Sequence, residues 1–182
     1  MTQVKGKAGV ALACLVVISG DCAATDPAPG TFESLARVFA GTWQVSVREE
    51  PIKDVRPAED GEGEEFWTLQ PGEVVLTERY QAKTSKANDF LVFWWDQKEH
   101  GIRGMFCAAF TAHGCNPLQA SWANNTLVLT GQYEAGGAHS AHYEFEATFS
   151  VGADGKLTQI ARIAKDGGPK NLIATIEGSK IN

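Results

Sequence analysis

Two dense apolar runs, separated by a short polar turn, form the strongest pattern in the chain and lie within Asp89–Phe110. The first run is apolar at every position of Phe90–Trp95, and the polar segment Asp96–Gly101 follows it, which predicts a β-hairpin. Successive side chains of a strand point to opposite faces, so neither face of this strand is polar. A barrel covers both faces if one meets a packed or ligand-filled interior and the other meets a helix, a loop or a partner.

A short amphipathic helix is expected ahead of the strands. Thr31 is a suitable N-cap, apolar residues recur at helical spacing over Phe32–Phe39, and Gly41 ends the pattern. Such a helix has one buried stripe and is suited to plugging one end of a barrel.

Alternation of polar and apolar residues predicts the remaining strands, most clearly over His142–Val151, where the apolar residues share one face. The other expected strands are Gly41–Val47, Phe66–Gln70, Val74–Ala82, Gln119–Trp122, Thr126–Tyr133, Leu157–Ala164 and Leu172–Gly178. The predicted fold class is all-β, an antiparallel up-and-down barrel of about 8–10 strands with one short N-terminal helix.

Two polar segments are expected to be loops. Glu49–Glu65 is polar throughout and ends in the acidic run Glu59–Glu65, which indicates a solvated, mobile connection. The spacing of these carboxylates differs from that of a helix-loop-helix calcium loop, so calcium binding is the less favoured interpretation. Thr111–Leu118, which contains Gly and Pro, is the second expected loop.

The first 24 residues are typical of a secretory signal peptide, because an apolar run over Ala8–Ile18 follows basic residues and precedes a small-residue site ending at Ala24. This run of eleven residues is too short to span a membrane, which takes about 20 residues, so no transmembrane span is predicted. Lipid attachment at Cys14 or Cys22 is an alternative that the residues around them favour less. We expect residues 1–24 to be removed, 25–30 to be a tether, and 31–182 to be a periplasmic or secreted barrel domain.

Removal of the signal peptide leaves Cys107 and Cys115 as the only thiols, and an exported protein lives in an oxidising compartment. We therefore expect a disulfide that closes a nine-residue loop. The alternative is a metal site formed by both cysteines with His113, but it lacks a zinc spacing and a nearby fourth ligand. His139 and His142 would point to opposite faces of a strand, so no metal site is predicted.

Charge and motifs exclude several kinds of function. A net charge of −6, a pI near 5.2 and the lack of any Lys and Arg cluster argue against nucleic-acid binding. No Gly-x-Ser-x-Gly nucleophile motif and no Gly-rich phosphate loop occur, so neither a hydrolase signature nor a cofactor is predicted. The oligomeric state is left open.

The order of these segments resembles the calycin group, which includes lipocalins, fatty-acid-binding proteins and lipocalin-like bacterial domains. Four features carry the resemblance, in this order along the chain: a short helix, a strand that opens with Gly41-Thr42-Trp43, a long polar connection, and an aromatic-rich hairpin that regular strands follow to the end. The chain looks most like an exported member of the lipocalin-like family DUF1579. The resemblance implies the barrel fold but no established activity.

The resemblance also bears on particular residues. In lipocalins an Arg of a late strand packs against the Trp of the first strand, which by position implies that Arg162 packs against Trp43. The nitrobindin branch of the group binds haem through a His near its C-terminal end, but here no His follows His142, which argues against haem.

We expect the barrel to bind a small apolar or amphipathic molecule, because buried Trp and Tyr carry N–H and O–H groups that need partners and a barrel can hold one small ligand. The expected lining residues are Trp67, Tyr80, Trp94, Phe106, Trp122 and Tyr143. One alternative is an isomerase or hydrolase that uses the same cavity, with Glu78 and either His100 or His142 as acid-base groups. Another is an envelope interaction module with a filled barrel, in which the outer face of the central hairpin docks a partner.

Overall fold

The structure, a computed structural model, describes residues 31–51, 58–72, 74–83, 89–108, 111–134 and 141–181. The predicted signal peptide, the tether and His139 lie outside these residues. The described chain forms α1 (Phe32–Phe39), β1 (Gly41–Glu49), β2 (Glu59–Leu69), β3 (Val75–Ala82), β4 (Phe90–Asp96), β5 (Gly101–Cys107), β6 (Cys115–Ala123), β7 (Thr126–Glu134), β8 (His142–Val151), β9 (Lys156–Lys165) and β10 (Asn171–Lys180).

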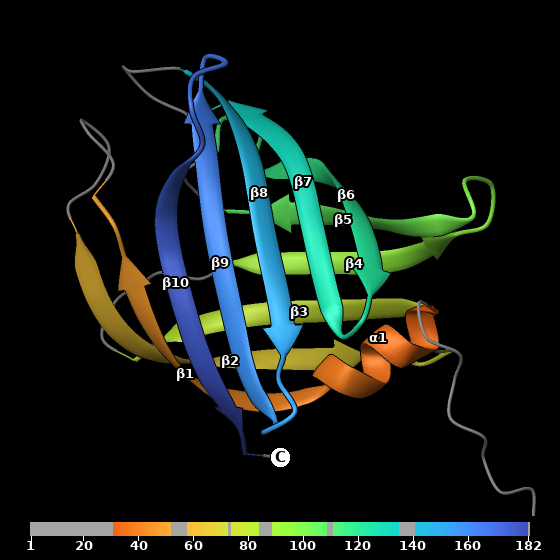
Figure 1. Cartoon of the computed structure of the whole chain (residues 1–182). Helices are drawn as coiled ribbons and strands as arrows, with labels where there is room; N and C mark the ends of the chain where they lie inside the picture. The colour runs from red at the N-terminus through yellow and green to blue at the C-terminus, as the bar shows by residue number, and fades with distance from the viewer. Residues whose placement is uncertain are drawn as a thin grey trace, which may run out of the picture.

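The strands form one closed barrel in which each strand pairs antiparallel with the next and β1 pairs with β10 (Figure 1). Closure leaves no unpaired sheet edge, so the backbone N–H and C=O groups of every strand find partners within the sheet. The prediction of an all-β, antiparallel up-and-down barrel with one short helix is confirmed.

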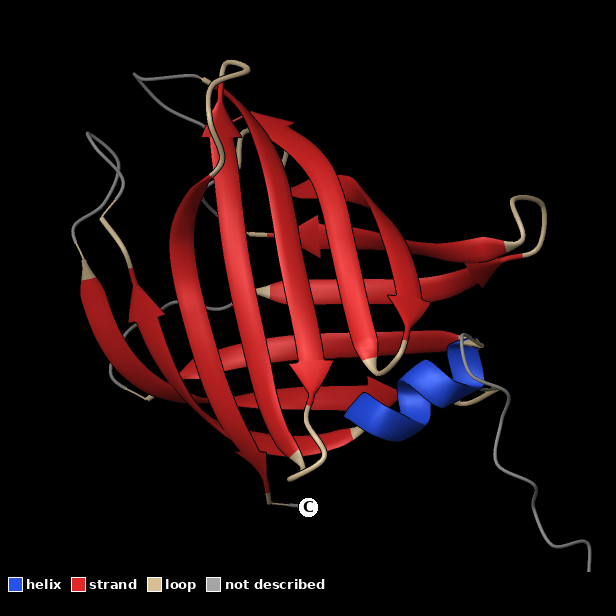
Figure 2. Ribbon diagram, in the orientation of Figure 1, coloured by secondary structure: helices blue, strands red, loops and turns tan. Residues whose placement is uncertain are grey.

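The helix α1 lies across one end of the barrel (Figure 2). The Thr31 hydroxyl accepts a hydrogen bond from the Ser34 N–H at 3.2 Å, so the predicted N-cap is present. The Phe39 ring stacks on Trp67 at 4.7 Å between centroids, and the Trp122 Nε1–H donates to the Ser34 hydroxyl at 2.7 Å. The apolar stripe of the helix and two indole rings therefore form a packed plug.

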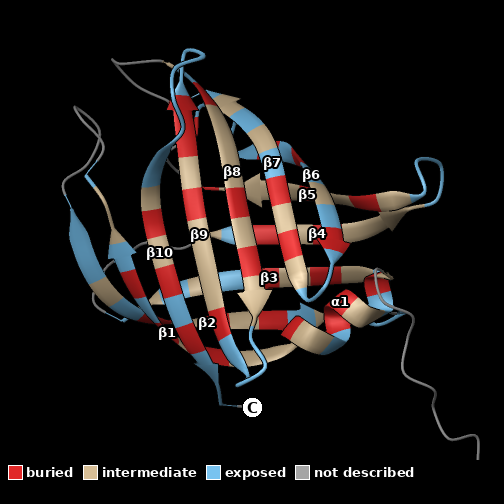
Figure 3. Ribbon diagram, viewed as in Figure 1, coloured by how far each residue is buried: buried red, intermediate tan, exposed pale blue. Residues whose placement is uncertain are grey.

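Buried residues alternate along the strands, as the banding of β7 to β10 shows (Figure 3). In β8, Tyr143, Ala147 and Phe149 are buried and face the interior, as the sequence pattern predicted. The largest fully buried side chains lie in α1 and next to it in the barrel, so the core is densest at the end that the helix covers.

Two predicted loops are wrong in part, because both segments contain strand residues; residues 52–57 of the first lie outside the described residues. The acidic run opens β2, where Gly61, Gly63 and Glu65 face the interior while the intervening acidic residues face outward. Pairing with β1 and β3 satisfies the backbone of this run and outweighs its low strand propensity. The predicted loop Thr111–Leu118 likewise contains the first residues of β6, which pair with β5.

Candidate functional site

The two ends of the barrel interior differ in solvent exposure. Beneath α1, the inward-pointing Trp67 and Phe149 are fully buried. At the opposite end, the inward-pointing Tyr80, Phe106 and Phe145 are only half-buried. A side chain that faces the inside of a closed barrel and still contacts solvent marks an interior that opens to water. The candidate site is this open half of the barrel.

Aromatic rings form much of the inner surface of the open half. The rings of Phe106 in β5 and Phe145 in β8 stack at 5.9 Å with an interplanar angle of 10°, although two strands separate them in the sheet. Tyr133 and Tyr143, direct partners in β7 and β8, stack at 5.2 Å. Gly131 of β7 has no side chain, and a Cβ there would lie 2.5 Å from the Leu118 side chain of β6. These rings provide flat apolar surface for a ligand.

A pair of buried carboxyl groups lies on the same inner surface. Glu65 in β2 is 1% exposed and Glu78 in β3 is 3% exposed. Glu65 is opposite Tyr80 and Trp67 is opposite Glu78, so the two glutamates are diagonal neighbours on one face of the β2–β3 pair. The Trp67 Nε1–H donates a hydrogen bond to Glu65 Oε2 at 3.0 Å.

Burial shifts the proton equilibria of this pair. Desolvation raises the pKa of Glu65 to about 7, although the Trp67 hydrogen bond opposes the shift. The pKa of Glu78 is raised well above its usual value by burial first, then by the charges of Glu65 and Asp89. Burial, and then the charges of Glu49, Asp89, Glu65 and Glu59, raise the pKa of Tyr80 to about 12, so its hydroxyl stays protonated. At neutral pH the pair therefore holds protons that exposed glutamates would have lost.

Asn116 places an unpaired polar group on the inner surface. It is 5% exposed and lies on the same inward-pointing face of β6 as the buried Leu118 and Trp122. Its Nδ2 atom is buried and has no hydrogen-bond partner in the described structure. A buried amide N–H without an acceptor is unfavourable, so this group is suited to an acceptor brought by another molecule.

The six predicted lining residues fall into three groups. Tyr80, Phe106 and Tyr143 lie in the open half. Trp67 and Trp122 face inward but belong to the plug beneath α1. The prediction that Trp94 lines the interior is wrong, because Trp94 directly follows the buried, inward-pointing Phe93 in β4 and therefore points outward. Sequence reasoning also missed Glu65 and Asn116, which it assigned to loops.

The disulfide between Cys107 and Cys115 is confirmed. The two cysteines are direct partners in β5 and β6, next to the pair formed by Phe106 and Asn116. The bond thus ties together two strands at the rim of the open half. Among the residues that the structure describes, no cluster of three or more His, Cys, Asp or Glu side chains is placed to bind a metal ion.

The histidines considered for acid-base chemistry lie away from the buried carboxyls. His100 is exposed in the turn between β4 and β5. His142 is exposed at the start of β8, and its backbone N–H donates to Asp166 at 3.3 Å. The structure therefore does not join either histidine to Glu78 in an acid-base pair.

The residue that packs against the first-strand Trp differs from the one implied by the lipocalin resemblance. The Lys180 ammonium lies 5.2 Å from the Trp43 ring centroid and donates to the Val38 carbonyl at 3.3 Å. Arg162 instead lies on the outer face of β9, within 4.0 Å of the Glu146 carboxylate. Lys180 is the basic residue that contacts the Trp43 ring because it is the direct partner of Trp43 across β1 and β10.

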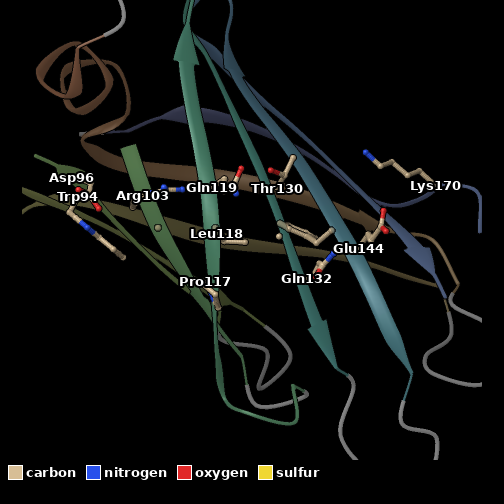
Figure 4. A pocket seen from close by; sticks show the side chains of 13 residues that line it. Trp94, Asp96, Arg103, Pro117, Leu118, Gln119, Thr130, Gln132, Glu144 and Lys170 are labelled. Carbon is tan, nitrogen blue, oxygen red and sulfur yellow. The ribbon is translucent and has the colours of Figure 1, made fainter. Parts of the chain in front are cut away.

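A groove of about 850 Å³ lies on the outer face of the sheet, over β4 to β8 (Figure 4). Trp94, Arg103 and Gln119 are successive cross-strand partners along it. Most of its lining residues belong to the outward-pointing sets of their strands, and Leu118 and Phe145, from the inward-pointing sets of β6 and β8, also line it.

The closed sheet, the single plugging helix and the half-open aromatic interior define a lipocalin-like β-barrel. No family model matches the chain, and neither does any curated protein. None of the described helices is long and apolar enough to cross a membrane.

Proposed function

We propose that this protein is an exported, calycin-type binding protein that holds a small amphipathic molecule in the open half of its barrel. The observation that carries this proposal is the contrast between the buried aromatic plug beneath α1 and the half-buried inward-pointing rings of Tyr80, Phe106 and Phe145. Barrels of this kind commonly enclose one ligand, and a ligand site combines mainly apolar walls with a few polar groups.

Three features support the proposal beyond the open end. The aromatic rings provide the apolar wall, and Glu65, Glu78 and Asn116 provide polar groups on the same inner surface. The disulfide at the rim suits an oxidising compartment, in agreement with the signal-like N-terminal sequence. Membership of the DUF1579 type of lipocalin-like domain is supported by three features: the short helix ahead of the strands, the strand that opens with Gly41-Thr42-Trp43, and the closed barrel.

The direct test is a titration with N-phenyl-1-naphthylamine, an apolar dye whose fluorescence increases in a dry environment. We expect saturable binding with one site per chain. Phe106→Ala removes one wall of the site, and losing about 55 Å² of apolar contact weakens binding about 10-fold. Trp94→Ala is the matched control, since it removes an aromatic side chain from the outer face of the neighbouring strand and leaves the affinity unchanged.

Two results would contradict the proposal. One is the absence of saturable dye binding to the wild-type protein, which would indicate a filled barrel. The other is a loss of binding in Trp94→Ala with none in Phe106→Ala, which would place the dye on the outer face. Native mass spectrometry of the exported protein would show any molecule that co-purifies with it.

A further inference from the structure

The open half of the barrel has an unbalanced distribution of charge. Glu65 and Glu78 are diagonal neighbours with almost no solvent contact. Asp89, whose carbonyl accepts from the Tyr80 N–H, adds its charge from the start of β4. Further acidic residues of β1 and β2 act on the Tyr80 hydroxyl from the rim. Among the described residues, the charged groups that act on Glu78 and Tyr80 are therefore all acidic.

Three basic side chains that the structure describes on β3, just after β3 and on β10 are engaged elsewhere. Arg79 points outward and lies 4.9 Å from the Phe66 ring centroid. Lys83 pairs with the exposed Glu62 at 3.1 Å. Lys180 is held over the Trp43 ring and by a backbone carbonyl at the plugged end. Burial, and then the charges of Glu65 and Asp89, raise the pKa of Glu78.

Two adjacent buried carboxyl groups without a cation are unfavourable for stability, and amide or apolar side chains would fill the same volume without that cost. Their presence is explained if a cation from outside completes the arrangement. Asn116 gives a second, independent indication of a ligand, because its buried Nδ2 has no partner.

The register places Asn116 in the same row as the acidic pair. Glu78 is opposite Leu91, Leu91 is opposite Phe106, and Phe106 is opposite Asn116, so all four inward-pointing residues lie along one line across the strands. Three strand spacings separate Glu78 from Asn116, about 14 Å along the curved sheet. A small molecule inside the barrel can contact both ends of this row while its apolar part lies on the aromatic rings.

We propose that the barrel ligand is an organic amine bound as its ammonium ion, with N–H groups donated to the carboxylates of Glu65 and Glu78, its apolar body against Phe106 and Phe145, and an acceptor group for Asn116. This inference rests on the proposed function and adds the chemical class of the ligand. Charge-assisted hydrogen bonds in a water-poor site are stronger than those of a neutral head group. The amine must displace the protons that the carboxyl groups hold in the free protein, so binding releases protons.

The test compares three ligands with the same apolar body: n-octylamine, n-octanol and octanoate. Each is titrated directly by calorimetry and in competition with N-phenyl-1-naphthylamine. We expect octylammonium to bind at least 10-fold more tightly than octanol, and octanoate to bind least, because charged hydrogen bonds are stronger and like charges repel. Titrations in buffers of different ionisation enthalpy should show proton release with octylammonium alone.

The pH dependence provides a measurement on the wild-type protein. Octylamine, like a lysine side chain, stays protonated between pH 6 and pH 8. The pKa of about 7 for Glu65 means that its ionised fraction rises about 10-fold over this range, so the affinity for octylammonium rises about 10-fold while that for octanol stays constant.

Glu65→Gln and Glu78→Gln keep the shape of the site and remove its charge, so we expect each to lose the preference for amine over alcohol while still binding the dye. Glu62→Gln, an exposed change on the same strand as Glu65, is the matched control and keeps the preference. Equal affinity of wild-type protein for octanol and octylammonium, with the dye bound, overturns the amine inference and leaves the proposed function standing. Binding of neither the dye nor any of the three ligands overturns both.

Discussion

Replacement of Glu65 by Gln should stabilise the free protein at alkaline pH. The pKa of Glu65 is raised from 4.5 to about 7 in the folded protein, chiefly by desolvation. A raised pKa means that the folded state favours the protonated carboxyl. The contribution of this group to the free energy of unfolding is therefore fully present below pH 4.5 and is lost as the pH rises through 7. A shift of this size corresponds to about 3 kcal/mol.

Gln is a neutral isostere that can still accept the Trp67 Nε1–H hydrogen bond. We therefore expect Glu65→Gln to match the wild-type protein near pH 4.5 and to exceed its free energy of unfolding by about 3 kcal/mol at pH 8. Urea unfolding, followed by Trp fluorescence, measures this difference in the free energy of unfolding. With a slope of about 2 kcal/mol per molar urea, the midpoint should rise by about 1.5 M at pH 8.

Glu62→Gln is the control, because Glu62 is exposed and its pair with Lys83 is a surface contact. Its difference from wild type should stay below about 1 kcal/mol and should not grow above pH 4.5. If the difference between Glu65→Gln and wild type were the same at pH 4.5 and pH 8, burial would not control the Glu65 proton equilibrium and the reasoning would be refuted.

Phe39→Ala should lower the free energy of unfolding by about 3–5 kcal/mol in urea, because the ring is fully buried in the plug; a loss below 1 kcal/mol would show that α1 is not docked. Gly63→Ala should cost about 1–3 kcal/mol, since its Cβ would lie 2.7 Å from a backbone oxygen; unchanged stability would contradict this packing. Alkylation without reductant should label neither Cys107 nor Cys115, and labelling of both would show free thiols. The intact mass of the exported protein should correspond to a chain beginning at Thr25, and retention of Met1 would disprove cleavage.

Local patterns were sufficient for most of the fold. The helix over Phe32–Phe39, the hairpin around Asp96–Gly101 and the alternation of His142–Val151 each depend on residues close together in sequence, and the structure confirms all three. The disulfide was also predictable, because only two cysteines lie outside the segment predicted to be a signal peptide.

The placement of Glu65 and Glu78 together inside the barrel was decided only by the tertiary structure. Glu78 shares the apolar face of Leu76 in the sequence pattern, but Glu65 ends a run of acidic residues that by composition indicates a loop. The period-two arrangement of Gly61, Gly63 and Glu65 was the available signal, and glycine contributes too little hydrophobicity to make it visible. Pairing with β1 and β3 turned this run into a strand and placed the Glu65 carboxyl inside.

The inward face of the central hairpin was likewise decided only by closure of the barrel. Phe90–Trp95 is apolar on both faces, so alternation alone does not distinguish the set containing Trp94 from the set containing Phe93. Register with β3 and β5 directs Phe93 into the core and Trp94 toward the outer groove. The sequence by itself determined that this strand is central, and the register, which depends on residues distant in the chain, determined which of its side chains meet the interior.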